Sequence, residues 1–343
     1  MELHFTRTNG PVDDHIDELI SMAGDVSHPG MIREMILAAL KAGVEQASRE
    51  DMRLMNYTMK EMRFTSKIFG QYRDVKKVTV FGSARTKPDE PVYSIAREFG
   101  RKLAEAGFMV ITGAGGGIMQ AANEGAGPEH SFGVNITLPF EQRPNPVLEG
   151  NPRLITYRYF FNRKVAFVKE ADAIALFPGG FGTLDEAMET LTLVQTGKHS
   201  PLPLLLIDEP GGTYWLRWDK FLRHELLSEG YISESDFNLF ELVDSVDEAV
   251  ELIARFYRRY HSLRYVDGKL VIRMRSPLED SIVRHLKNEF SDLLSAGGDM
   301  YPSAALPREK DEPEINDLPR LVLDFNRKDF GRLRKLIHEI NDH

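Results

Sequence analysis

The 343-residue sequence contains no cysteine, which excludes disulfide bonds, thiolate metal sites and a cysteine nucleophile. Its apolar runs are all too short to span a bilayer, and the start, Met1 to Thr6, lacks the basic-then-apolar layout of a signal peptide. Acidic residues outnumber basic ones, and the formal net charge is −9. The chain therefore has no overall positive field that would attract a polyanion such as a nucleic acid. We therefore expect a cytoplasmic protein whose partners include neither nucleic acid nor a membrane.

An alternation of strand-like and helix-like segments begins near Val75 and dominates the middle of the chain. Short apolar runs typical of buried parallel strands alternate with amphipathic stretches of helical spacing. This pattern predicts an α/β fold, a Rossmann-like doubly wound parallel sheet with helices on both faces, over residues 75–262. The expected strands cover residues 78–81, 108–111, 132–138, 154–157, 173–177, 204–207 and 239–243.

Two flanking segments lack this alternation. Residues 1–74 have apolar stripes at helical spacing, which predict an N-terminal helical extension that packs on the main domain or on a sister subunit. Residues 263–343 are predicted to form a small C-terminal α+β appendage of βα…βα type, with strands at 269–274 and 321–325. Within it, the stretch 297–319 is polar, acidic and proline-rich, which is typical of a loop or a hairpin connection.

The nine residues from Pro178 to Glu186 read Pro-Gly-Gly-Phe-Gly-Thr-Leu-Asp-Glu and lie between an apolar strand and a helix-like segment. Glycines here let backbone N–H groups approach a ligand closely, and a helix N-terminus favours an anion. Glu186 would lie in the first helical turn and face the same space, so the stretch suggests an enzyme that acts on a phosphorylated substrate. A structural alternative is a capping box, with Thr183 at the N-cap and Glu186 three residues later.

Two more loops follow predicted strands and should reach the same edge of the sheet, where parallel sheets bind ligands. They are Gly82-Ser83-Ala84-Arg85 and the glycine-rich run from Gly113 to Gly117. The run lacks the Lys-Ser/Thr of a P-loop, and Ile118 stands where a dinucleotide fingerprint needs its third glycine. Hydrolysis of ATP or GTP and a bound NAD are therefore not favoured.

These loops together resemble those of the LOG (Lonely guy) family, the cytokinin riboside 5′-monophosphate phosphoribohydrolases and their bacterial relatives. The family pattern P-G-G-x-G-T-x-x-E is matched in full from Pro178 to Glu186. The family's Arg-Lys pair on the preceding helix is matched by Arg163 and Lys164. The resemblance covers about residues 76–260 and leaves both flanking segments outside, as in a longer bacterial-type member.

The resemblance implies a hydrolase that cleaves the N-glycosidic bond of a nucleoside 5′-monophosphate, AMP-like or N6-modified, to free base and ribose 5-phosphate. It implies catalytic roles for Arg163 and Glu186, no metal or other cofactor, and a homodimer or a higher homo-oligomer. Glu186 is expected to stay ionised at neutral pH beside a helix N-terminus. The residues expected to bind substrate or phosphate are Gly82, Ser83, Arg85, Gly115, Gly116, Gly117, Lys164, Gly179, Gly180, Gly182 and Thr183.

Several alternatives remain open. The same loops would also serve a non-catalytic nucleotide-binding or sensor protein. Lysine decarboxylation, a label carried by many relatives, normally needs pyridoxal phosphate on a lysine, and no site for its ring is evident. Arg163 could instead form a surface salt bridge with Glu170. Phe161 and Asn162 stand where many plant-type members have an acidic residue, so a general purine or pyrimidine monophosphate fits as well as a cytokinin nucleotide.

Overall fold

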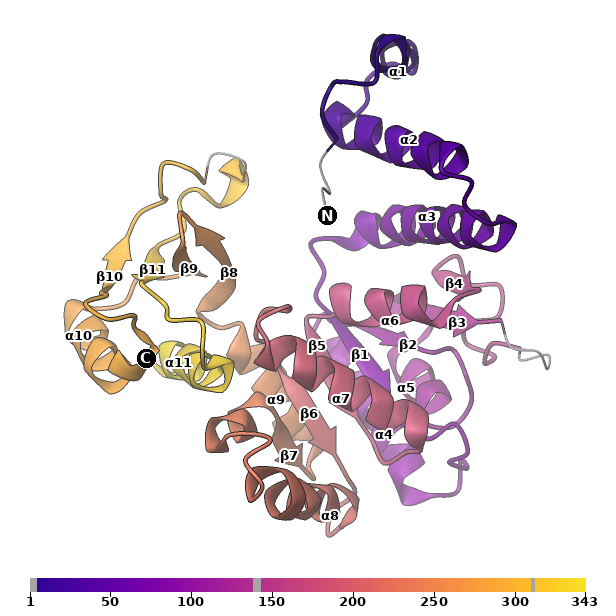
Figure 1. Ribbon diagram of the computed structural model, residues 1–343. Coiled ribbons are helices and arrows are strands. Elements are labelled where there is room, and N and C mark those ends of the chain that lie inside the picture. The colour runs from indigo at the N-terminus through magenta and orange to yellow at the C-terminus, as the bar shows by residue number, and fades with distance from the viewer. Residues whose placement is uncertain (1–4, 138–142, 310–311) are drawn as a thin grey trace. The chain divides into compact units, whose positions relative to one another are not determined.

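The computed structural model describes residues 5–137, 143–309 and 312–343, and the chain forms two compact units, Met1–Phe64 and Thr65–His343 (Figure 1). The first unit holds α1 (Pro11–Met22), α2 (Pro29–Val44) and most of α3 (Arg49–Phe69), so the helices expected in the N-terminal segment are confirmed. Proline begins α1 and α2, where its missing N–H would have no intrahelical partner in any case. Few side chains of this unit are buried; among them, Arg33 pairs with Asp13.

The second unit is built on a seven-stranded sheet in which every strand pair is parallel. The strand order is β4-β3-β2-β1-β5-β6-β7, so the predicted doubly wound α/β fold is confirmed. Each predicted strand of the sheet is present, although Leu138, the last residue of one of them, lies outside the described residues. The bounds are β1 (Lys77–Phe81), β2 (Met109–Thr112), β3 (Ser131–Ile136), β4 (Leu154–Tyr157), β5 (Ala173–Leu176), β6 (Leu204–Ile207) and β7 (Glu241–Val243).

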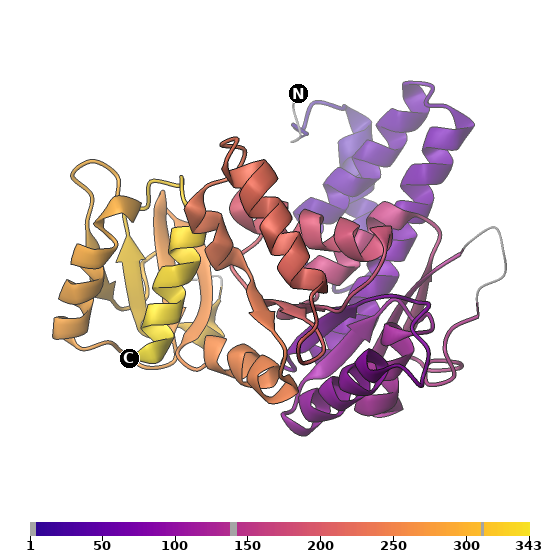
Figure 2. The ribbon, with the colours of Figure 1, turned by 90° about the horizontal axis from the view of Figure 1, so that it is seen from below.

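Helices cover both faces of this sheet, and each face has its own hydrophobic core (Figures 1 and 2). Successive side chains of β5 point to opposite faces: Ile174 joins one core and Ala175 joins the other. The order of strands reverses between β1 and β5, so their carboxyl ends flank the switch point at which such sheets bind ligands. One face is covered by α4 (Pro91–Glu105), α5 (Ile118–Ala126) and α9 (Val246–Phe256), and the other by α6 (Phe160–Lys169), α7 (Phe181–Gln195) and α8 (Tyr214–Phe221).

A second sheet, antiparallel, has the order β10-β11-β9-β8 and packs against two helices through one hydrophobic core (Figure 2). The α+β character predicted for the C-terminal segment is therefore confirmed. Among the described residues, none of the helices in either unit combines the length and the apolar character that crossing a membrane requires. The strands of this second sheet and its two helices are β8 (Tyr260–Val266), β9 (Lys269–Met274), α10 (Asp280–Glu289), β10 (Met300–Ser303), β11 (Arg320–Leu323) and α11 (Phe330–Asp342).

Two strands of this second sheet are not expected from the sequence pattern. β8 alternates between polar and apolar residues, so it lacks the apolar run by which the other strands are predicted. The Asp267-Gly268 pair that joins β8 to β9 is nevertheless typical of a hairpin turn, and both residues have a positive φ, 51° and 84°. β10 lies inside the stretch 297–319 that is predicted to be a connection, and Pro302 argues against a central strand. Because β10 is at the edge of the sheet, its proline is tolerated there, and its antiparallel pairing with β11 agrees with the hairpin form of that connection.

Candidate active site

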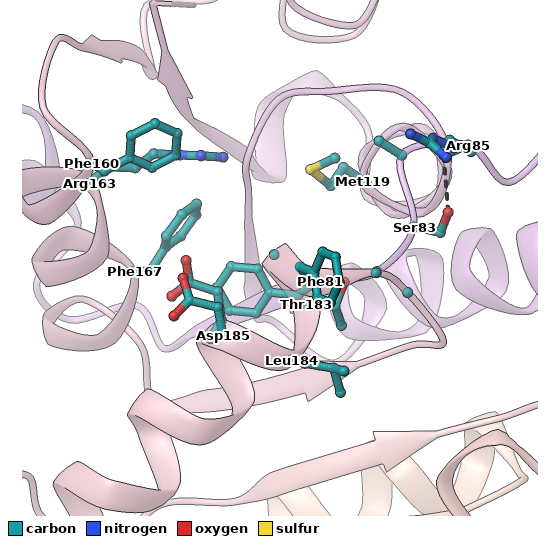
Figure 3. A pocket seen from close by; sticks show the side chains of 17 residues that line it. Phe81, Ser83, Arg85, Met119, Phe160, Arg163, Phe167, Thr183, Leu184 and Asp185 are labelled. Carbon is teal, nitrogen blue, oxygen red and sulfur yellow. Dashed lines mark hydrogen bonds between the residues drawn. The ribbon is translucent and has the colours of Figure 1, made fainter. Parts of the chain in front are cut away.

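The carboxyl ends of β1 and β5 open into a cavity of about 770 Å³ (Figure 3). Its walls come mainly from the loop 82–85 after β1, from α6, and from residues 179–186, which include the start of α7. The backbone N–H of Ser83 donates a hydrogen bond to the Pro178 carbonyl oxygen at 3.0 Å and so joins the two loops. The Tyr214 hydroxyl of α8 donates to the Gly179 carbonyl oxygen at 2.6 Å, which fixes the second loop further.

α7 begins at Phe181, with Gly180 as its N-cap in an extended conformation. Thr183 and Glu186 therefore do not form a capping box, because Thr183 is the third residue of the helix and Glu186 lies in its second turn. The Thr183 hydroxyl packs against Gly179 instead, where a Cβ atom would lie only 2.2 Å from Oγ1. The helix starts three residues earlier than the capping box requires, because the absence of a side chain at Gly179 permits this close approach.

The N-terminus of α7 presents backbone N–H groups to the cavity. Thr183 and Leu184 donate theirs to the Gly180 carbonyl oxygen, both at 3.1 Å, whereas those of Phe181 and Gly182 meet no acceptor within the described part of the chain. Cβ atoms on Gly180 and Gly182 would approach no atom within 4 Å, so the protein itself does not require glycine at either position. With the positive end of the helix dipole behind them, these N–H groups can hold an anion such as a phosphate.

Glu186 is the buried carboxylate of the cavity: only 8% of its surface is exposed, and its Oε2 atom lacks a hydrogen-bond partner among the described residues. Burial raises its pKa to about 7; Lys164 and Arg163 oppose the rise, whereas Glu189 and Asp185 add to it. At this pKa the carboxyl group is about half ionised at pH 7, because burial outweighs the attraction of the two cations of α6, whereas the sequence predicts that it stays ionised. A carboxyl group with a pKa near neutrality can accept a proton and return it within one reaction cycle.

Arg163 reaches the cavity from α6 and is half-buried (Figure 3). Its Nε donates to the Val134 carbonyl oxygen of β3 at 2.9 Å, and its guanidinium carbon lies 5.0 Å from the centre of the Phe167 ring. Gly113 leaves room for this arrangement, because a Cβ atom there would approach Nη2 to 2.4 Å. The alternative of a surface salt bridge with Glu170 is wrong, because that carboxylate pairs with the adjacent lysine of α6. Arg163 thus brings positive charge into the cavity.

Lys164 is predicted to bind substrate or phosphate, but its side chain lies against α7. Its Nζ is 2.8 Å from a carboxylate oxygen of Asp185, 2.8 Å from one of Glu189 and 3.5 Å from Oε2 of Glu186. Burial disfavours the charged ammonium, but the hydrogen bonds to Asp185 and Glu189 outweigh burial and raise its pKa. The Lys164 charge therefore offsets the carboxylates of α7, and Lys164 is not part of the cavity wall.

The three predicted loops contribute unequally. The residues from Gly113 to Gly117 do not line the cavity, so the predicted ligand contacts of Gly115, Gly116 and Gly117 are not supported. This loop supports the one after β1 instead: Gly117 has a positive φ of 62°, and a Cβ atom there would lie 2.2 Å from the Ser83 carbonyl oxygen. The other predicted residues do line the cavity, namely Gly82, Ser83, Arg85, Gly179, Gly180, Gly182 and Thr183.

The cavity also has an apolar wall that the motifs do not reveal. Met119 of α5 and the two phenylalanines Phe160 and Phe167 of α6 line it (Figure 3). The position of Arg163 could have indicated both rings, because residues three and four apart share one face of a helix. The cavity therefore combines an anion-binding end with an apolar side, which suits a ligand that carries both a phosphate and a flat ring system.

The switch point of the parallel sheet thus brings together an open helix N-terminus, a buried carboxylate and an arginine, an arrangement that can accommodate a small anionic ligand. Residues 116–253 match the family model described as Possible lysine decarboxylase. The chain is 33% identical over 168 residues to the cytokinin riboside 5′-monophosphate phosphoribohydrolase LOG of Oryza sativa subsp. japonica, over 47% of this chain and 64% of that protein. It is 31% identical over 151 residues to the pyrimidine/purine nucleotide 5′-monophosphate nucleosidase of Escherichia coli (strain K12), over 40% of this chain and 33% of that protein.

These sequence matches show that the domain on the seven-stranded sheet is similar to proteins of the LOG family, as the motif from Pro178 to Glu186 predicts. The chain spans less than two thirds of the length of these two relatives. Among solved structures, the chain is similar to that of TM1055, a structural genomics target, with 25% identity and a TM-score of 0.38, over 53% of this chain and 99% of that chain.

Proposed function

We propose that this chain hydrolyses the N-glycosidic bond of a nucleoside 5′-monophosphate and releases the free base and ribose 5-phosphate. The observation that carries the proposal is Glu186, a buried carboxylate that lines the same cavity as the open N–H groups of α7 and has one oxygen without a hydrogen-bond partner among the described residues. A phosphate on those N–H groups would bring the attached ribose towards the carboxylate. The names of the relatives from rice and Escherichia coli, which describe this chemistry, support the proposal.

The phosphate would bind at the start of α7, on the backbone N–H groups of Phe181 and Gly182. Gly180 and Gly182 have open space where a Cβ atom would stand, so a ligand atom can come close to the backbone. The hydroxyl of Thr183, which lines the same cavity, can add a donor, and Arg85 lies at the wall with its guanidinium available to the anion. Backbone donors at a helix N-terminus hold a charged group with little reorganisation.

Hydrolysis forms a bond between a water oxygen and C1′ of the ribose and breaks the bond from C1′ to the base nitrogen. The electron pair of the broken bond leaves with the base, so positive charge develops on the ribose. Ionised Glu186 stabilises this charge, accepts the proton that the attacking water loses, and returns it to the departing base or to solvent. Arg163 stabilises the negative charge that develops on the base. The pKa of Glu186 at about 7 suits a group that takes up and releases a proton in each cycle.

Incubation with AMP, GMP, CMP, UMP and N6-isopentenyl-AMP, followed by chromatography of the free base, tests the proposal. We expect base release from at least one nucleotide. Glu186→Gln should lower kcat by roughly 10²- to 10⁴-fold and leave ribose 5-phosphate binding largely intact, because the anion donors are backbone groups. No release from any of the five would contradict the proposal. Nucleotide binding without turnover would instead support the non-catalytic binding protein.

Lysine decarboxylation, which the family description mentions, is less compatible with the site. Chemistry based on pyridoxal phosphate needs a lysine whose neutral amine can form a Schiff base. Lys164 is instead paired with three carboxylates, and its pKa is raised. Lys198 follows the opposite end of α7 from the cavity. The site therefore favours the hydrolysis of a glycosidic bond.

We also propose that the chain assembles as a homodimer or larger homo-oligomer through the helices that bear the site. Apolar side chains are exposed on both of these helices, where water would otherwise meet a large hydrophobic area. A second copy on this surface would shield the cavity as well. A cytoplasmic location stays a prediction, which imaging of the tagged full-length chain would test. The exposed fractions are 54% for Phe160, 45% for Phe161, 47% for Val165, 94% for Phe181 and 38% for Met188.

A further inference from the structure

The two adjacent cations of α6 lie in different surroundings. Arg163 lines the cavity, whereas Lys164 lies against α7, with its Nζ between Asp185 and Glu189 and 3.5 Å from Oε2 of Glu186. We propose that Lys164 is a positioning residue that keeps Glu186 ionised for the hydrolysis, without itself touching the substrate. This inference rests on the proposed function, which assigns the ionised form of Glu186 to the reaction.

The geometry of the ammonium group supports this role. Its Nζ lies 2.8 Å from carboxylate oxygens of both Glu189 and Asp185, whereas Oε2 of Glu186 has no hydrogen-bond partner in the described part of the chain. At 3.5 Å the ammonium is close enough to stabilise a negative charge on Oε2. Because it does not donate to that oxygen, Oε2 stays free to accept a proton from water. A direct hydrogen bond would occupy the acceptor, and a more distant cation would not stabilise its charge.

The neighbouring charges show why a cation is needed at this position. Asp185 and Glu189 flank Glu186 on α7, and both raise its pKa in the same direction as burial does. From α6, Arg163 and Lys164 act in the opposite direction, but Arg163 also donates to a backbone carbonyl of β3 and faces the cavity. Lys164 is the cation that contacts all three carboxylates of this segment. Without it, three acidic groups would repel one another around a buried carboxyl group.

Lys164→Met tests the inference through the pH dependence of kcat/KM, whose acidic limb reports the pKa of the group that must be ionised. Loss of a cation within ion-pair distance should move that limb upward by about 1 to 3 pH units. At pH 7 the variant should therefore lose activity by roughly 5- to 500-fold, and it should recover towards the wild-type rate at higher pH. Lys164→Arg keeps the charge, so its limb should stay nearer to that of the wild type.

Lys169→Met is the matched control, because Lys169 belongs to the same helix, has a side chain that is 60% exposed, and pairs with Glu170. The acidic limb of the pH dependence of kcat/KM should be the same in Lys169→Met as in the wild type. Circular dichroism melting of each variant verifies that it is folded. A loss of activity in Lys164→Met by the same factor at every pH, with an unmoved limb, would overturn the inference and leave the proposed function standing.

A second readout is independent of turnover. Difference infrared spectroscopy follows the protonated carboxyl band that Glu186→Gln removes, so it reports the protonation of Glu186 directly. That band should persist to higher pH in Lys164→Met than in the wild type. An unchanged titration would contradict the role of Lys164 even in an inactive protein. Absence of base release from the wild type at every pH, with a shifted titration, would contradict the proposed function but not the effect of Lys164 on Glu186.

Discussion

Glu186 weakens the fold when it is ionised, because it is 8% exposed and one of its oxygens has no hydrogen-bond partner among the described residues. Its pKa is raised from an ordinary value of 4.5 to about 7, so the folded protein holds this proton more tightly than the unfolded chain does. Since the folded-state pKa is the higher one, the free energy of unfolding falls as the pH rises from about 4.5 to about 7, and this loss is complete above pH 7.

Glu186→Gln should therefore stabilise the protein at pH 8, by up to about 3 kcal/mol, since each pKa unit corresponds to about 1.4 kcal/mol. The gain should shrink to less than about 1 kcal/mol at pH 5, where the carboxyl group of the folded wild type is protonated. Urea unfolding at pH 5 and pH 8 measures the difference in the free energy of unfolding between the variant and the wild type. Glu105→Gln, at an exposed carboxylate, should give no such pH-dependent gain. Equal stability of Glu186→Gln and wild type at pH 8 would contradict this account of the buried carboxylate.

Gly179 and Gly180 are adjacent glycines whose substitution should separate folding from binding. A Cβ atom on Gly179 would lie 2.2 Å from the Thr183 hydroxyl oxygen, whereas one on Gly180 would meet nothing within 4 Å. Gly179→Ala should therefore destabilise the protein by roughly 1–3 kcal/mol. Gly180→Ala should change stability by less than about 1 kcal/mol, yet raise KM at least about tenfold, because its methyl group would occupy the space of the phosphate. Unfolding curves and nucleotide kinetics check both; an unchanged KM in Gly180→Ala would place the phosphate elsewhere.

At the scale of the elements, α7 carries the proposed anion site at one end and meets the C-terminal helix at the other. Gly197 follows α7, and a Cβ atom there would lie 2.1 Å from the Phe330 ring of α11. Arg334 of α11 is 2% exposed and donates to both carboxylate oxygens of Glu241 in β7, at 2.8 and 2.7 Å. It also donates to the Leu202 carbonyl oxygen ahead of β6 at 3.2 Å. α11 therefore ties the antiparallel sheet to the parallel one, in agreement with their place in one compact unit.

Arg334→Met should destabilise this unit by about 3 kcal/mol, because it removes one partner of a largely buried ion pair and leaves Glu241 without its cation. Thermal unfolding followed by calorimetry measures the loss, and both sheets should unfold in one transition. Arg255→Met is a matched control, since Arg255 is 48% exposed and its ion pair with Asp342 should contribute less than about 1 kcal/mol. An Arg334→Met protein as stable as Arg255→Met would show that α11 does not hold the sheets together.

At the scale of the whole molecule, the exposed apolar side chains of α6 and α7 bear on assembly. Val165 is 47% exposed on α6 and is absent from the cavity wall, so a charge there should weaken self-association without altering the site. Light scattering should give at least twice the chain mass of 39.0 kDa for the wild type, and a lower mass for Val165→Glu. A wild-type protein that elutes with the mass of a single chain would contradict the proposed oligomer. The packing of the N-terminal helices on the main domain or on a sister subunit also stays a prediction.

The amino-acid sequence by itself determined the doubly wound sheet and the loops at its switch point. Apolar runs, helical spacing and glycine positions are local properties, so the strands up to β7 and the glycine loop from Gly179 to Gly182 can be read directly. β8 and β10 cannot be predicted in this way, for physical reasons. The first has a polar alternating pattern, and the second contains Pro302, which only an edge position allows.

Only the tertiary structure decided how the site is charged and which glycines form it. The pKa of Glu186 depends on burial and on cations from α6, and no spacing along the chain reveals how near Lys164 comes to it. The start of α7 at Phe181 is decided by the approach of Thr183 to Gly179, which replaces the expected capping box. The loop from Gly113 to Gly117 carries the composition of a ligand loop, yet it lies against loop 82–85 instead of lining the cavity, because packing between loops is a property of the assembled fold.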